Sequence, residues 1–165
     1  MSQIDELLAN SEAYAEQFDK GDLPLPPARK VVVIACMDAR LNPYGLLGLS
    51  EGDAHVLRNA GGVVTEDELR SLAISQRVLG TTEIILIQHT DCGMRGFRED
   101  EFIASIEAET GRRPSWTAEP LGDPDSDVRE SLDRIVANPF IPHKHSIRGF
   151  VYEVETGKLR EVPLS

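Results

Sequence analysis

Two cysteines and one histidine stand out, because side chains of these types bind metal ions. Cys36 ends one apolar run, while His89 and Cys92 follow another and are separated by two residues. That spacing lets one loop supply two ligands to a tetrahedral ion, and Cys36 can join them from a neighbouring strand. Two thiolates and one imidazole favour zinc. Three protein ligands leave the fourth position open, so the pattern predicts a catalytic zinc site that activates water.

Two charged residues closely follow Cys36. If the chain stays extended there, the Asp38 carboxylate lies on the side of the thiol and can accept a hydrogen bond from a zinc-bound water or bind zinc itself. Arg40 can keep that carboxylate ionised and off the zinc through a bidentate pair. We therefore expect Asp38 and Arg40 to form a catalytic pair, with water and Asp38 competing for the fourth position. Asp91 is interpreted as a residue that shapes the second ligand loop.

Buried strands are predicted immediately before these residues. Residues 30–36 and 83–88 are rich in β-branched side chains, as is typical of parallel strands covered on both faces, and residues 54–58 form a further strand. Helices are predicted at residues 3–19, from the capping box at Thr65 toward Gly80, from Phe102 to Gly111, and from Val128 to Val136, and residues 147–162 form an edge hairpin. Strands alternating with helices predict an α/β fold with a mostly parallel central sheet flanked by helices. Reactive groups in such folds gather beyond the carboxyl ends of the strands, where both cysteines fall.

The 165 residues fit a single domain, spanning 1–165. Within it, we expect an α/β core at 30–165. Residues 1–29 form an N-terminal amphipathic helix and a Pro-rich strap, and the apolar face of that helix requires a surface to cover.

The composition disfavours some classes of binding partner and indicates a cellular compartment. With 28 acidic and 17 basic residues the formal net charge is −11, which disfavours nucleic acid and anionic membrane surfaces. The apolar runs are far shorter than the roughly 20 residues of a membrane-spanning helix. No export signal is apparent at the N-terminus, so a cytoplasmic protein is expected.

Three segments together carry a family resemblance. Cys36–Arg40, Arg58–Gly62 and His89–Gly93 occur in the order and spacing that resemble the signature of the β-class carbonic anhydrases, in particular their compact bacterial and archaeal branch. The resemblance implies zinc on Cys36, His89 and Cys92, with Asp38 and Arg40 as the catalytic dyad. It implies reversible hydration of CO2 to bicarbonate and a proton through a zinc-bound hydroxide. It also implies a homodimer, sometimes assembled further into a tetramer, in which the N-terminal helix clasps the partner.

Three other functions fit parts of the same pattern. Proteins that resemble this branch include hydrolases of carbonyl sulfide and carbon disulfide with the same zinc ligands. A non-catalytic, zinc-stabilised regulatory module would result if Asp38 permanently closed the fourth position. A thiol redox protein could use Cys36 and Cys92, although the absence of a Cys-x-x-Cys pair argues against it.

Overall fold

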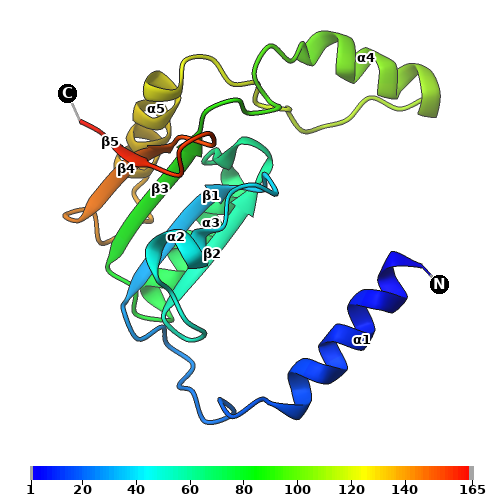
Figure 1. The fold of residues 1–165 in the computed structure, drawn as a ribbon. Helices are drawn as coiled ribbons and strands as arrows, with labels where there is room; N and C mark the ends of the chain where they lie inside the picture. The colour runs from blue at the N-terminus through cyan, green and yellow to red at the C-terminus, as the bar shows by residue number, and fades with distance from the viewer. Residues whose placement is uncertain (1, 164–165) are drawn as a thin grey trace.

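A five-stranded sheet forms the centre of the molecule in the computed structural model, which describes residues 2–163 (Figure 1). The strands lie in the spatial order β2 (Ala54–Asn59), β1 (Val31–Cys36), β3 (Glu83–His89), β4 (Ile147–Tyr152) and β5 (Leu159–Val162). The first four are mutually parallel, and β5 pairs with β4 in the antiparallel sense. The predicted mostly parallel α/β fold is therefore confirmed.

Helices cover both faces of the sheet. On one face, α3 (Glu66–Arg77) and α5 (Pro124–Ala137) bury side chains such as Leu72 and Leu132 against the central strands. The fit of α5 on β4 is close, since a Cβ at Gly149 would clash with side chains of this helix. On the other face, the short helix α2 (Pro43–Leu47) contributes to a second apolar cluster that also contains Cys36 and Cys92. The cysteines thus lie at the edge of a packed core.

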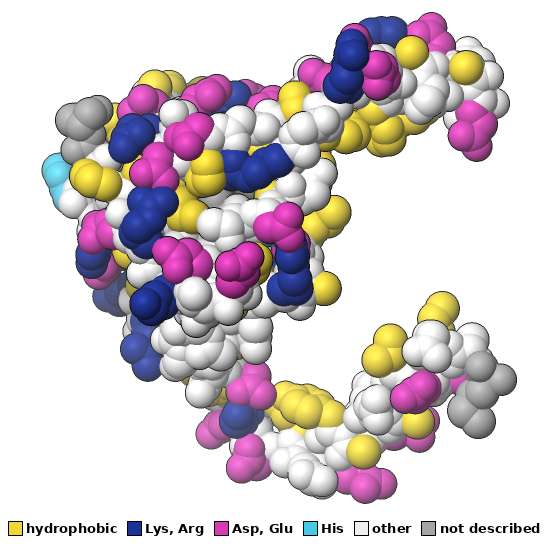
Figure 2. Space-filling model, turned by 45° about the horizontal axis from the view of Figure 1, so that its top comes forward, with side chains coloured by type: hydrophobic (Ala, Val, Ile, Leu, Met, Phe, Trp, Pro, Cys, Tyr) yellow, Lys and Arg dark blue, Asp and Glu magenta, His cyan; other side chains and the backbone are white. Residues whose placement is uncertain are grey.

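Two helices extend away from this body (Figure 1). Helix α1 (Gln3–Glu16) begins with a capping box at Ser2 and has no buried residue. Its large apolar side chains are exposed at Ile4, Leu7, Leu8 and Tyr14. Helix α4 (Glu99–Thr110) projects from another part of the core, and Figure 2 shows a wide hollow between the two projections. Within the described chain, no helix is long and apolar enough to cross a membrane.

Several element boundaries differ from those predicted. Helix α1 ends at Glu16 instead of residue 19, because the amides of Gln17 and Phe18 bond to carbonyl oxygens three residues back and tighten the last turn. Strand β1 begins after Lys30, whose φ of +55° is incompatible with a strand. Helix α3 ends at Arg77, and Gly80, with φ of +76°, redirects the chain just beyond it. The hairpin strands are also shorter, at 147–152 and 159–162.

Helix α2 was not predicted. Five residues are too few to show a helical hydrophobic period, but its end signals are present in the sequence. The side chain of Asn42 accepts a hydrogen bond from the Gly45 amide, Pro43 occupies the first turn, and Gly48 ends the helix in the left-handed conformation.

Candidate metal centre

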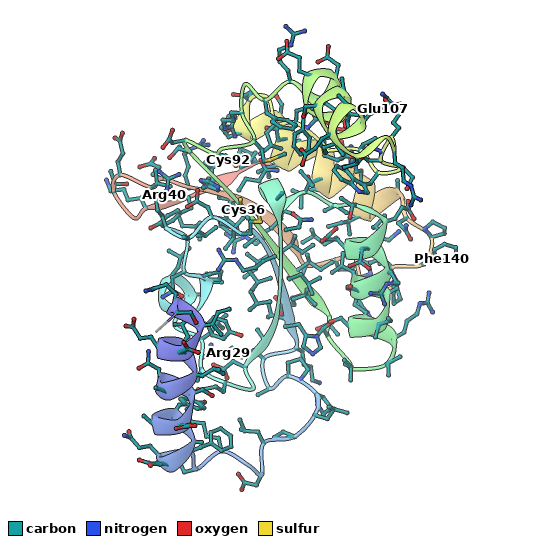
Figure 3. All side chains as sticks on the ribbon, turned by 90° about the vertical axis from the view of Figure 1, so that its right-hand side faces the viewer. Arg29, Cys36, Arg40, Cys92, Glu107 and Phe140 are labelled. Atoms are coloured by element: carbon teal, nitrogen blue, oxygen red, sulfur yellow. The ribbon has the colours of Figure 1, made fainter. Side chains whose placement is uncertain are left out.

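The ends of two adjacent parallel strands bring the three predicted ligands together. Cys36 is the last residue of β1, His89 is the last residue of β3, and Cys92 lies three residues beyond it. The Sγ atoms of Cys36 and Cys92 are 3.9 Å apart, and the donor atoms of all three residues lie within 4.8 Å of one another. Tetrahedral bonds of about 2.3 Å to one zinc ion would place two sulfurs about 3.8 Å apart. Cys36 and Cys92 lie near each other in Figure 3.

The imidazole of His89 is oriented for a metal. Its Nδ1 lies 2.8 Å from the carbonyl oxygen of Thr90, which can only accept, so Nδ1 carries the proton and donates. Nε2 then bears a lone pair. It is fully buried and has no hydrogen-bond partner among the described residues. A buried imidazole nitrogen without a partner, facing two thiols, fits a zinc ion.

The two thiols differ in acidity. Burial tends to raise the pKa of Cys36, but the His89 imidazole and the backbone N–H groups of Asp38 and Gly61 together lower it to about 7. Burial raises the pKa of Cys92 above its usual value. One thiolate is therefore accessible near neutral pH, and a bound metal would favour loss of the second thiol proton.

Asp38 lies at the edge of this cluster, with Oδ2 3.7 Å from His89 Nε2. The Arg40 guanidinium donates two hydrogen bonds to the same carboxylate, with Nε 3.0 Å from Oδ1 and Nη2 2.8 Å from Oδ2. The Arg40 guanidinium and backbone N–H hold the pKa of Asp38 far below its usual range. The structure thus places all five predicted site residues together, with the carboxylate ionised beside the donor atoms.

Two residues of the Arg58–Gly62 segment support the loop after Cys36, and we did not predict these roles. The guanidinium of Arg58, on β2, donates to the carbonyl oxygens of Cys36, Asp38 and Leu41, at distances of 2.7 to 3.0 Å. Gly62 has φ of +63°, and a Cβ there would lie 2.7 Å from the backbone nitrogen of Cys36. The sequence signal for these two residues was that they belong to the Arg58–Gly62 motif. The motif does not show which backbone atoms they contact.

An apolar cavity of about 380 Å³ lies beside the ligand loops. Its lining includes Ala60 and Met94. Ala60 follows Asn59, the β2 residue paired with Cys36, and Met94 lies two residues after Cys92. The aromatic rings of Phe97, Phe102 and Trp116 close it on the α4 side. Such walls suit a small apolar molecule.

Comparisons with known proteins agree with this arrangement. A family model described as carbonic anhydrase matches residues 31–119. Beta-carbonic anhydrase 1 of Mycobacterium tuberculosis is 57% identical over 162 residues, covering 98% of this chain and 99% of the relative. A carbon disulfide hydrolase of Acidianus is 36% identical over 183 residues, covering 96% of this chain and 88% of that protein. The crystal structure of a carbonic anhydrase from Streptococcus mutans superposes with a TM-score of 0.91 at 40% identity, covering 99% of both chains. With its Cys–His–Cys cluster at the strand ends, the chain belongs to the β-carbonic anhydrase family.

Proposed function

We propose that this protein is a zinc-dependent carbonic anhydrase, a lyase that catalyses the reversible hydration of CO2 to bicarbonate and a proton. The observation that carries the proposal is the convergence of two buried sulfurs and an unpartnered imidazole nitrogen within 4.8 Å. We propose Cys36, His89 and Cys92 as the zinc ligands. Membership of the β-carbonic anhydrase family supports both the metal and the reaction.

Zinc, when bound, supplies a Lewis acid that provides a nucleophile from water near neutral pH. In our proposal, the Asp38 carboxylate orients that nucleophile by accepting its hydrogen bond. Arg40 keeps Asp38 ionised, so Asp38 Oδ2 accepts but does not carry away the proton at ordinary pH. The proton therefore leaves to solvent or buffer. The cavity beside the loops can hold CO2 against its aromatic and aliphatic wall, which includes Met94, Phe97 and Trp116.

Stopped-flow CO2 hydration by the zinc-loaded protein tests the proposal. Wild-type protein should turn over, Cys92→Ser should lose both zinc and activity, and Asp38→Asn should keep zinc with reduced kcat. Ser105→Ala, on the projecting helix α4, is the control and should match the wild type. A zinc-loaded wild type that is inactive from pH 6 to 9 would contradict the proposal and favour a regulatory module with only a structural zinc.

Hydrolysis of carbon disulfide or carbonyl sulfide is the second candidate. It is favoured by the Acidianus relative, a carbon disulfide hydrolase that is 36% identical and matches nearly all of this chain. Carbon disulfide, carbonyl sulfide and CO2 are linear molecules that one nucleophile can attack at carbon. An assay of sulfide release from carbon disulfide or carbonyl sulfide, with the same zinc-loaded preparation, distinguishes the candidates. Turnover of CO2 without sulfide release would exclude the second candidate.

We propose further that the chain forms a homodimer through α1, and that a tetramer is the larger assembly. The support is the exposed apolar face of α1, where Leu7 is 66% exposed, together with its position away from its own core (Figure 2). Light scattering after gel filtration should give the dimer mass or a multiple. Leu7→Asp should shift the protein toward monomer, whereas Ala13→Asp, which adds the same charge on the opposite side of the helix, should not. A monomeric wild type would contradict this.

We also propose that the chain works as a single domain, 1–165, in the cytoplasm. The support for that compartment is that Cys36 and Cys92 are both free thiols, as reducing conditions would keep them. Fractionation of the source cells tests the location, and recovery of the protein outside the cytoplasm would contradict it.

A further inference from the structure

Arg40 bridges the two loops that carry the zinc ligands. Its Nε and Nη2 bind Asp38, two residues away, while Nη1 lies 2.8 Å from Asp91 Oδ2 and Nη2 lies 2.9 Å from the Asp91 carbonyl oxygen. All three guanidinium nitrogens are thus engaged. Figure 3 shows Arg40 near Cys36 and Cys92.

We propose that Asp91 is a positioning residue for the reaction: it fixes Arg40 from the His89–Cys92 loop, and Arg40 in turn fixes the Asp38 carboxylate. This inference rests on the proposed function, in which Asp38 orients the nucleophile. Asp91 itself touches no donor atom of the metal cluster in the structure, so its effect must pass through Arg40.

The backbone of Asp91 is held in an unusual conformation that suits this contact. Its φ is +53°, in the left-handed region that few residues other than glycine adopt, although aspartate tolerates it better than most. In this conformation Asp91 turns both its carboxylate and its carbonyl oxygen to the same guanidinium. Uncommon backbone conformations of this kind cluster at functional sites.

Exposure shows why Arg40 requires a second anchor. Its side chain is 48% exposed and that of Asp91 is 79% exposed, whereas that of Asp38 is only 15% exposed. A half-exposed arginine held by one carboxylate alone can exchange among several rotamers. Pairing with Asp91 on the neighbouring loop restricts the guanidinium to the orientation that faces both oxygens of Asp38.

The exposed position of Asp91 also separates its role from folding. Its carboxylate fills no space in the core, so Asp91→Asn removes the charge while retaining the shape and the carbonyl contact. We expect kcat to fall about two- to fivefold, the upper range for a solvent-screened ion pair and far less than the roughly hundredfold cost of displacing a catalytic group by 1 Å. KM for CO2 should stay within about twofold, because no substrate contact is removed. Asp91→Glu should recover part of the loss.

A double-mutant cycle with Arg40→Ala tests the route. If Asp91 acts through Arg40, Asp91→Asn should lower kcat in the native background and by less than about 1.5-fold in the Arg40→Ala background. Asp67→Asn is the matched control, because it removes another exposed aspartate paired with an arginine, Arg70, away from the site. This control should leave kcat unchanged. Equal losses in both backgrounds, or no loss in the native background, would overturn the proposal.

A spectroscopic measurement keeps this test independent of turnover. In protein loaded with Co²⁺ in place of zinc, the visible absorption reports the surroundings of the metal. Asp91→Asn should change the bands in the native background and leave them unchanged in the Arg40→Ala background. Unchanged bands in both backgrounds would overturn the positioning role. If the wild type proved inactive toward CO2, the proposed function would fail, and the cobalt spectra alone would decide whether Asp91 positions this pair.

Discussion

Replacing Gly62 with alanine should damage the metal centre from a position that carries no ligand. Gly62 has φ of +63°, which costs about 1–2 kcal/mol for a residue with a Cβ. The added carbon would also lie 2.7 Å from the backbone nitrogen of Cys36 and 3.0 Å from the carbonyl carbon of Ala35. These are backbone atoms of the central strand β1, so neither can rotate away, and overpacking of this kind costs about 1–3 kcal/mol.

The two terms together predict a loss of about 2–5 kcal/mol in the free energy of unfolding. For a chain of this length the melting temperature should fall by roughly 5–15 °C. Relief of the clash must move the Cys36 backbone, so the Cys36–Cys92 sulfur pair should no longer match a tetrahedral ion. We therefore expect weaker zinc binding in addition to lower stability.

Gly80→Ala separates the cost of the backbone conformation from the cost of the steric clash. Gly80 has φ of +76°, but nothing lies within 4 Å of a Cβ built there, so this variant carries only the backbone cost. Thermal unfolding of both variants, followed by circular dichroism, and zinc content after dialysis against a weak chelator are the measurements. Gly62→Ala should melt below Gly80→Ala and retain less zinc. Equal melting temperatures and equal zinc contents would refute the reasoning.

Three further outcomes are expected. Gly149→Ala should lower the free energy of unfolding by about 1–3 kcal/mol in denaturant titrations, because its methyl group overlaps the Val128 side chain; an unchanged midpoint would contradict the close packing of α5 on β4. The Lys20 ammonium lowers the pKa of Glu51 from 4.5 to about 2, so the stability that wild type has over Glu51→Gln should be complete above pH 4.5 and lost as the pH falls toward 2. Calorimetry at pH 6 and pH 3 checks this sign, and a difference that does not shrink on acidification would reverse it. Chelation of zinc should lower the free energy of unfolding by about 4 kcal/mol relative to protein in free zinc at a thousandfold excess over Kd. Added zinc should restore the stability. Melting curves that are the same with and without the chelator would contradict zinc binding.

The architecture could be predicted because its signals are local. The runs ending at Cys36 and at His89 are apolar on both faces, as strands in the centre of a parallel sheet must be. The ligand set followed from the same runs, since the carboxyl ends of adjacent parallel strands fall at one edge of the sheet. The boundaries were predicted less well where contacts from distant segments decide them. The positive φ at Lys30, for example, is set by tertiary hydrogen bonds from Thr82 and Glu83 to its carbonyl oxygen.

Contacts that join distant segments could not be predicted in this way. Arg58 was visible as part of a motif, but its bonds to three carbonyl oxygens of the loop after Cys36 depend on the registry of β2 with β1. Gly62 offers no side chain to interpret, and its role appears only when the Cys36 backbone lies against it. The contact of Arg40 with Asp91 spans 51 positions and depends on a left-handed residue.

The residues that hold the metal and the residues that orient Asp38 are fixed by different kinds of contact. The metal donors are fixed by elements that cannot move independently, since Cys36 and His89 are strand residues and Cys92 is buried in the adjacent cluster. Asp38 instead lies on the loop after β1, where Arg58 binds its carbonyl oxygen and Arg40 binds its carboxylate. Substitutions in the strands should therefore change metal content and stability together. Substitutions in the Arg40–Asp91 contact should change turnover while leaving both intact, because exposed ion pairs add little to stability but can fix the orientation of a charged group.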